Sequence, residues 1–438
     1  MARDLDALTE CFDCGLLQRL PKASEGALLT CRRCDAVLGH IRGSSVHLSL
    51  VAAVLGLALM GFALLRPAAS LTLMGSRVTE AGLVEGVELL KQAGTWELGI
   101  AVALTLFIFP VLKLGSVALM AVYALRGNAP RWVKSFYAHM YELGEWAMVD
   151  VFLLGAMVAL VRMRAWGEVW YGPALVALAG VAVCTLAIDA LTDPRAFWKR
   201  LDSVRGGAEA DGHGADPDLT AEAPDRSVPP IGCRHCGAVV RRASGQRCPR
   251  CEQTLHRRKP HSLPRTWAFL IGGTLLLLPA NVLPVMTVVK MGRGGADTIL
   301  SGTIELSEHG LWGLAFIVFV ASIIIPIMKL AALTVLLVIT RRRSVASLRV
   351  RTKVYRVVAL IGRWSMIDIF ATMTLVAISR FGWIGSVLPG PGASAFCAVV
   401  FLTMIASESF DPRLMWDAAG RNQPGPSLVP VTNRQALA

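Results

Sequence analysis

The sequence predicts an all-α polytopic membrane protein with two tandem four-helix transmembrane repeats, eight transmembrane helices in total, each repeat preceded by a small cytoplasmic cysteine module. Three observations predict this class. Of the 438 residues, 54% are hydrophobic and only 17% are charged, the apolar residues lie in long runs, and two Cys-x-x-Cys hooks precede each of two similar halves. Such a composition is too apolar for a soluble chain of this length.

The expected domain organisation follows from these blocks. Residues 1–44 and 231–260 form the cysteine modules, 45–200 and 261–417 the transmembrane repeats, 201–230 a linker and 418–438 a cytoplasmic tail. The linker is rich in Gly, Ala, Asp, Glu and Pro and has almost no large apolar residue, so we expect it to be disordered.

The first module carries four cysteines in two hooks: Cys11, Cys14, Cys31 and Cys34. Two hooks supply four thiolates to one tetrahedral ion, and the 16 residues between them allow a short hairpin. Gly15 follows the first hook, where the backbone must turn tightly. We interpret the module as zinc-ribbon-like and its zinc as structural, because four cysteines leave no ligand position open for substrate.

The first repeat contains four apolar runs, each near the ~20 residues that a helix needs to cross a bilayer. They cover about 46–65, 98–125, 143–161 and 171–191. The first run lies behind four cysteines and a charged stretch, so it does not resemble a cleaved signal peptide. We expect the N-terminus to stay on the protein.

Two ionisable side chains fall inside these runs. Lys113 and Asp150 lie at depths that differ by only ~5 Å when each is counted from the cytoplasmic end of its run. A charge at that depth is costly and needs a partner, so we predict an ion pair between them. Pro110 removes a helix hydrogen bond one turn before the lysine, which predicts a helix kink there.

The second module repeats the hooks with Cys233, Cys236, Cys248 and Cys251, separated by 11 residues, and Gly237 repeats the turn. His235 and His256 are near enough to compete as ligands, but four cysteines make neither necessary. We expect two structural zinc ions per chain. Iron in a rubredoxin-like site is the less favoured ion, because the same thiolates accept it, and disulfides are disfavoured among reduced cytoplasmic thiols.

The second repeat has apolar runs at about 267–289, 311–340, 357–378 and 393–407, and the start of the last is uncertain. Pro326, Lys329 and Asp368 repeat the marks of the first half, which predicts a second kink and a second ion pair. The candidate transport path comprises Lys113, Asp150, Lys329, Asp368, Thr372 and Glu408. The alternative is that these charges only fix helix packing. Ser365, Thr372, Thr374 and Glu408 favour the second half as the site of a path.

Basic residues near the ends of the spans predict orientation. They cluster at 126–134, 241–265 and 341–356, so these segments, both termini and both modules should be cytoplasmic. Because each half has an even number of spans, both halves insert the same way up. The net charge of +13 then suits anionic headgroups, and we expect no nucleic-acid partner. The sequence has no HExxH, GxSxG or GxxxxGK[ST] motif, so we do not expect an enzyme.

The order of these elements resembles the paraquat-inducible protein A family. The resemblance covers roughly residues 8–416 and is carried by LPANVLP at 278–284, ILSG at 299–302 and SIIIPIMK at 322–329. It implies a multi-pass protein of the Gram-negative inner membrane that works with a periplasmic MCE-domain protein. The implied role is the passage of phospholipid between the inner membrane and the MCE tunnel, which supports envelope integrity.

Two other functions stay open on the residues alone. An ion- or proton-coupled small-molecule transporter would also need charges inside its spans. A metal-sensing or redox-sensing membrane protein would use the cysteine modules, with iron or reversible thiol oxidation as its signature.

Overall fold

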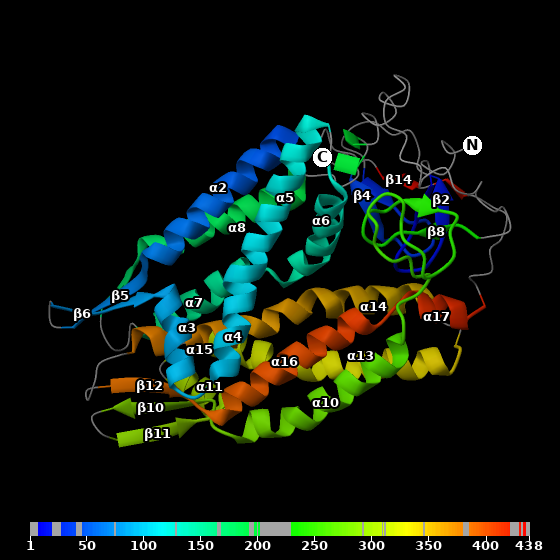
Figure 1. The fold of residues 1–438 in the computed structure, drawn as a ribbon. Helices are drawn as coiled ribbons and strands as arrows, with labels where there is room; N and C mark the ends of the chain where they lie inside the picture. Colours follow the sequence, from blue (N-terminus) through cyan, green and yellow to red (C-terminus); the bar gives the residue numbers. More distant parts are fainter. Residues whose placement is uncertain are drawn as a thin grey trace.

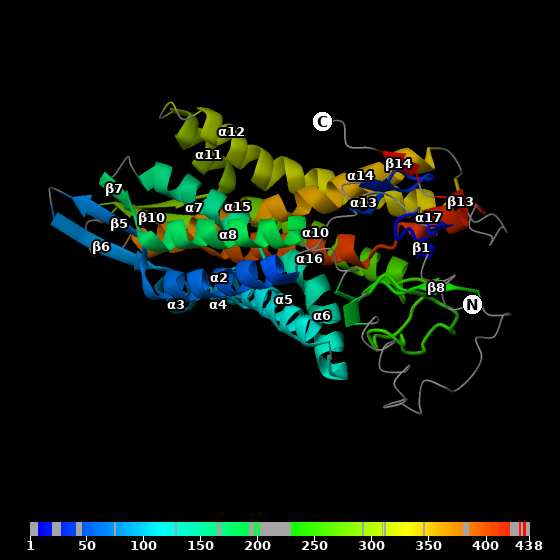
Figure 2. The same cartoon turned by 90° about the horizontal axis from the view of Figure 1, so that it is seen from above.

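The computed structural model describes residues 8–19, 28–40, 46–73, 76–127, 129–163, 168–191, 197–198, 200–201, 229–290, 293–308, 310, 312–344, 347–379, 385–420, 429–430 and 432–434. The long helices run side by side, with β-sheets at one end and the cysteine modules at the other (Figure 1 and Figure 2). We call these ends the sheet end and the module end. The predicted linker lies, over 202–228, outside the described residues.

Eight helices in the described part of the chain are long and apolar enough to cross a membrane, as the sequence predicts. They are Val46–Leu65, Trp96–Arg126, Gly144–Met163, Pro173–Ala190, Ser262–Val282, Ala315–Arg341, Leu348–Ile378 and Pro391–Ser409. The fifth predicted span was too long. Its helix ends at Val282 and the residues from Met286 onward form a strand, because Pro284 interrupts the run and β-branched residues follow it.

From the first span to the last, the two repeats contain the same order of helices, and in the second repeat α17 follows the last span. The first consists of α2 (Val46–Leu65), α3 (Leu83–Gln92), α4 (Trp96–Val102), the π-helix η1 (Ala103–Ile108), α5 (Phe109–Arg126), α6 (Arg131–Leu143), the 3-10 helix η2 (Gly144–Trp146), α7 (Val149–Met163) and α8 (Pro173–Leu191). The second consists of α10 (Ser262–Val282), α11 (Ile299–Glu308), α12 (Trp312–Phe319), the π-helix η4 (Val320–Ile324), α13 (Ile325–Arg341), α14 (Leu348–Ile361), the 3-10 helix η5 (Gly362–Met366), α15 (Ile367–Ile378), α16 (Pro391–Ser409) and α17 (Arg413–Ala418).

Each repeat also carries a three-stranded antiparallel sheet at the sheet end, which the sequence did not predict. In the first, β5 (Pro67–Leu73) lies between β6 (Ser76–Gly82) and β7 (Glu168–Tyr171). In the second, β10 (Met286–Lys290) lies between β11 (Arg293–Asp297) and β12 (Gly385–Pro389). In each sheet, two strands come from the connection that follows the first span of the repeat, and the third strand comes from the connection between the last two spans. Each sheet therefore links these two connections.

The repeats meet along α7 and α15. Phe152 and Phe370 pack edge to face across this contact, with ring centroids 5.5 Å apart. Gly155 allows the close approach, since a Cβ there would lie 2.7 Å from the carbonyl oxygen of Ile367. Small residues at such crossings let membrane helices pack closely without a hydrophobic driving force between them.

The cysteine modules are built from short strands. The first contains β1 (Leu8–Glu10), β2 (Leu17–Arg19), β3 (Leu28–Thr30) and β4 (Val37–His40), and the second contains β8 (Ile231–Gly232) and β9 (Val239–Val240). Two strands from the C-terminal tail join the first module: β13 (Val429–Pro430) runs parallel to β2, and β14 (Thr432–Arg434) pairs antiparallel with β3.

Each module packs against the repeat that it does not precede. In the first module, the Asp13 carboxylate accepts a 2.6 Å hydrogen bond from Arg356 on α14 of the second repeat. In the second module, the Gln253 amide donates to Ser135 on α6 of the first repeat, and Glu252 lies 3.1 Å from Arg131 of the same helix. The modules therefore cross over, and each couples the two halves of the chain.

Candidate functional site

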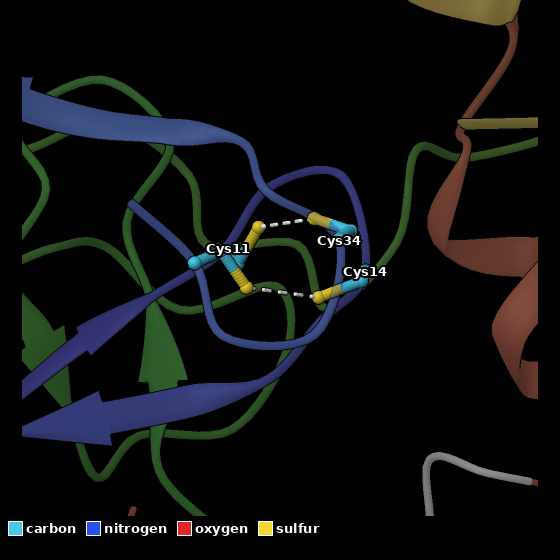
Figure 3. Close-up of side chains that lie close together, drawn as sticks. Cys11, Cys14 and Cys34 are labelled. Atoms are coloured by element: carbon cyan, nitrogen blue, oxygen red, sulfur yellow. Dashed lines mark hydrogen bonds between the residues drawn. The ribbon is translucent and has the colours of Figure 1, made fainter. Parts of the chain in front are cut away.

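The four sulfurs of each module lie together and face one another. In the first module Cys11 and Cys34 Sγ are 3.5 Å apart (Figure 3). Cys14 and Cys31 Sγ are 3.6 Å apart. In the second module the corresponding distances are 3.6 Å for Cys233 with Cys251 and 3.7 Å for Cys236 with Cys248. All four Sγ atoms of a module fall within 4.8 Å of one another.

These distances fit a tetrahedral metal centre. A Zn–S bond of about 2.3 Å gives sulfur–sulfur edges of about 3.8 Å, whereas a disulfide would need about 2.05 Å. The eight predicted ligands are therefore brought together in two buried sets of four, and each set can hold one metal ion. Since every ligand is a cysteine, neither set leaves a position for substrate or water.

The backbone of each hook is shaped for this arrangement. Gly15 N donates to the Cys11 carbonyl at 2.8 Å with φ of 72°, and Gly237 N donates to the Cys233 carbonyl at 2.9 Å with φ of 70°. The two predicted glycine turns are confirmed. Asp35 adopts the same left-handed conformation after the second hook of its module, with φ of 57°.

Hydrogen-bond donors also stabilise negative charge on the sulfurs. Gln18 Nε2 donates to Cys31 Sγ at 3.1 Å, and Arg356 Nη2 donates to Cys34 Sγ at 3.2 Å. Hydrogen bonds from the neighbouring cysteines lower the pKa of Cys31 in the first module and of Cys248 in the second. Arg356 thus contributes from the second repeat to the environment of a cysteine cluster that precedes the first.

The modules contact each other through a buried charged junction. The Glu10 carboxylate accepts from Gly232 N at 2.7 Å and from Arg413 at 3.1 Å. Arg413 also donates to both oxygens of Asp411, at 3.0 and 2.9 Å. Burial raises the pKa of Asp411, but the hydrogen bonds from Arg413 outweigh burial and hold that pKa below its ordinary value. One arginine thereby joins the last helix to the first module.

A second set of polar groups lies inside the membrane-spanning part of the second repeat. Asp368, in the first turn of α15, accepts a hydrogen bond from Ser322 on η4. Asp368 also lines a cavity of about 40 Å³ together with Arg162 and Thr372. The cavity lies toward the sheet end between the two repeats, and it is otherwise lined mainly by apolar side chains. Its size admits one or two water molecules.

Lys329 lies deeper toward the module end and is only 3% exposed. Its ammonium donates to Thr403 Oγ1 on α16 at 3.3 Å. It also lies against Gly362, where an added Cβ would be 2.7 Å from Nζ. The lysine therefore fills a space that depends on glycine at that position.

The predicted ion pair between Lys329 and Asp368 is wrong. Asp368 is level with Ser322, which precedes Lys329 by seven residues on the same helix, a rise of about 10 Å. The depth predicted for Asp368 was too close to the module end. The seventh span begins at Leu348 and not near 357, so Asp368 lies farther from the module end than its apolar run indicates.

The predicted pair between Lys113 and Asp150 is also wrong. The Lys113 ammonium instead lies 2.8 Å from Asp189 on α8, while Asp150 is exposed on the surface of α7. The carboxylate that pairs with Lys113 comes from the fourth span of the repeat, and not from the third.

Ser365 lies on the segment that links Gly362, which contacts Lys329, to Asp368. Within the 3-10 helix η5, residues three apart eclipse, so Gly362 and Ser365 share one face, and Asp368 follows three residues later in the first turn of α15. The Ser365 hydroxyl is buried and has no hydrogen-bond partner among the described residues. It thus adds a buried hydroxyl to the segment between Gly362 and Asp368.

In the first repeat, apolar residues replace three hydroxyl-bearing residues of the second repeat. Leu106, Ala147 and Leu154 occupy the positions that correspond to Ser322, Ser365 and Thr372. Ser322, Thr403 and Arg162 were not predicted as site residues. Comparing the halves position by position would have singled out Ser322, because a hydroxyl replaces an apolar side chain there.

Pro110 and Pro326 lie in the first turns of α5 and α13, each directly after a π-helical segment. The helix kinks expected at these prolines stay a prediction. In the second repeat the π-helical segment carries Ser322. Such segments inside α-helices often occur at functional sites.

Glu408, the last predicted path residue, lies near the end of α16 and lines a cavity of about 510 Å³ at the module end. The Lys259 ammonium donates to the backbone carbonyl of Glu408. Polar groups of the second repeat therefore occur from the small cavity at Asp368, through Ser365, Lys329 and Thr403, to this larger cavity.

Known proteins resemble the chain along most of its length. The family model described as Paraquat-inducible protein A matches residues 47–202 and again 263–420. The Lipophilic envelope-spanning tunnel protein A of Escherichia coli K12 is 30% identical over 93% of this chain and 91% of its own length. The Intermembrane transport protein PqiA of the same strain is 29% identical over 93% and 95%. A Probable intermembrane transport protein of Haemophilus influenzae is 27% identical over 95% and 96%. No solved structure matches the chain.

Proposed function

The chain belongs to the paraquat-inducible protein A family, and on that premise we propose that it passes phospholipid between the inner membrane of a Gram-negative bacterium and a periplasmic tunnel formed by an MCE-domain protein. Relatives that align over more than 90% of the chain carry names of intermembrane transport and of an envelope-spanning tunnel. This role supports envelope integrity and requires no enzymatic step.

The observation that carries the proposal is the row of buried polar groups in the second repeat, where Ser322, Ser365 and Thr372 stand at positions that are apolar in the first repeat. Charged groups inside membrane spans are costly and mark substrate or proton paths. Here Asp368 and Lys329 lie at different depths, each bonded to a hydroxyl and not to each other. A pair locked together would serve packing, whereas two separated ionisable groups suit a proton relay that drives lipid transfer.

The small cavity supplies the place where lipid movement would couple to this relay. It lies between the repeats, and its lining is apolar apart from a few groups that include Asp368 and Arg162. At about 40 Å³ it is far too small for an acyl chain, so transfer requires the repeats to separate along α7 and α15. Protonation of Asp368 would weaken its attraction to Arg162 and favour that opening.

The proposed orientation places the module end in the cytoplasm and the sheet end in the periplasm, with both termini cytoplasmic. Basic clusters beside the spans support it. The two antiparallel sheets then project toward the MCE partner, one from each repeat. We assign zinc to both cysteine clusters as a structural ion. It would hold each module in the conformation that packs against the repeat that the module does not precede.

The test is lipid transfer from proteoliposomes that contain the purified protein to its MCE-domain partner, measured with a fluorescent phospholipid over a range of pH. Asp368→Asn should reduce the rate at least tenfold and flatten its pH dependence, since a single proton acceptor is removed. Asp150→Asn is the matched control from the first repeat, and it should transfer lipid at the wild-type rate. A pH-independent rate that Asp368→Asn leaves unchanged would refute proton coupling.

A further inference from the structure

The larger cavity at the module end lies where all four parts of the molecule meet. Phe12 comes from the first module, Arg234 from the second, Glu145 from the first repeat, and Arg265 and Glu408 from the second repeat. Its volume is about 510 Å³. The crossed arrangement of the modules creates this space, because each module closes over the repeat that it does not precede.

The side chains that line this cavity carry more positive than negative charge. Three cationic side chains line it, Arg234, Lys259 and Arg265, against the two carboxylates of Glu145 and Glu408. Phe12 and Ile405 add apolar surface. A pocket with both signs of charge and an apolar border can recognise a zwitterion that carries an apolar tail.

The depth of the cavity matches that of lipid headgroups. Arg265 lies in the first turns of α10 and Glu408 in the last turn of α16, so the cavity is level with the ends of two spans. Basic pockets between membrane helices at the cytoplasmic surface bind phosphate-bearing headgroups. The bond from the Lys259 ammonium to the Glu408 carbonyl holds one cation at the wall of the cavity.

We propose that this cavity binds the headgroup of a phospholipid whose phosphodiester is followed by a primary ammonium, as in phosphatidylethanolamine. The guanidinium groups of Arg234 and Arg265 suit the phosphate, because each can donate two parallel hydrogen bonds. The carboxylates of Glu145 and Glu408 suit an ammonium that donates hydrogen bonds, which a quaternary choline cannot do. This inference rests on the proposed function. It adds the class of headgroup that the protein recognises and places lipid loading at the cytoplasmic leaflet.

The experiment measures binding of dihexanoyl phosphatidylethanolamine to the full chain in detergent by calorimetry, beside the matching phosphatidylcholine and inorganic phosphate. The ethanolamine lipid should bind about tenfold more tightly than the choline lipid, the gain expected from charge-assisted hydrogen bonds. Arg265→Gln should weaken both lipids about tenfold, and Glu145→Gln should remove only the preference between them. Arg342→Gln, an exposed arginine at the end of α13, is the control and should bind as the wild type does.

Three outcomes would overturn the inference: equal affinity for the two lipids, binding unchanged by Arg265→Gln, or inorganic phosphate that displaces the lipid at equal concentration, which would indicate a site for free phosphate. Arg265→Lys, which keeps the charge, should retain part of the affinity and separates recognition from misfolding. The transfer assay distinguishes this failure from failure of the proposed function. Wild-type transfer without headgroup binding would reject the cavity alone, and headgroup binding without transfer would reject the carrier role alone.

Discussion

Replacing Arg413 tests whether the buried junction holds the first module against the second repeat. The guanidinium is 3% exposed and donates three hydrogen bonds of 2.9 to 3.1 Å to Asp411 and Glu10. Arg413→Met keeps most of the side-chain volume but removes the cationic partner of buried Asp411 and leaves Glu10 with Arg258, whose Nη1 is 3.8 Å away. Breaking a buried ion pair from one side costs about 3 to 5 kcal/mol, so we expect the free energy of unfolding to fall by about 4 kcal/mol.

The assay is urea unfolding in detergent followed by tryptophan fluorescence. Trp416 is a local reporter, because it is buried on α17 and its ring lies 4.8 Å from the guanidinium carbon of Arg33 in the first module. Arg342→Met, at an exposed position, should change stability by less than about 0.5 kcal/mol. Unfolding curves that are the same for both variants would refute the role assigned to the junction.

The pH dependence follows from the pKa of Asp411. Arg413 holds this pKa below its ordinary value of about 3.9, so the pair stabilises the fold above that pH, and the stabilisation is lost as pH falls through the folded pKa. Without Arg413, burial would raise the pKa of Asp411. Acidification then neutralises the orphaned carboxylate, and the difference between variant and wild type should shrink as pH falls from about 8 to about 5.

Three further predictions use single substitutions, with Gly115→Ala as a common control because an added Cβ there meets nothing within 4 Å. Gly362→Ala places a Cβ 2.7 Å from the Lys329 ammonium and should reduce lipid transfer at least tenfold while the spans still insert; normal transfer would contradict the position assigned to the lysine. Gly155→Ala should push the repeats apart and destabilise the fold by about 2 kcal/mol, measured by urea unfolding. Cys31→Ser should lower the zinc content from two ions per chain to one in elemental analysis, and two retained ions would reject the tetrahedral assignment.

The crossed modules would give the proposed zinc ions a mechanical role. Arg356 of α14 contacts both Asp13 and the sulfur of Cys34 in the first module, while Gln253 of the second module contacts α6 of the first repeat. Loss of either ion would therefore loosen the contact between the two halves at the module end. Toward the sheet end the repeats touch through apolar side chains, where Met373 and Ala377 of α15 lie against Gly86 of α3, so an opening there would have to break this contact.

Eight spans, two four-cysteine clusters and a duplicated architecture could be predicted from the sequence because each depends on local properties. The length of an apolar run sets a span, and the spacing of Cys11 and Cys14 sets a hook, whatever the rest of the chain does. The glycine turn at Gly15 is equally local, since its left-handed backbone is decided within a few residues.

The partners of the buried charges were decided only by the tertiary structure. Lys329 bonds to Thr403 and Lys113 to Asp189, because the depth and rotation of helices far apart in sequence determine which side chains meet. The predicted pair of Lys329 with Asp368 failed because an apolar run does not reveal that α14 extends the seventh span, and the pair of Lys113 with Asp150 failed because the fourth span supplies Asp189 instead. The sheets and the crossed modules likewise arise from contacts between distant segments, and no periodicity within one segment encodes the element on which it will pack.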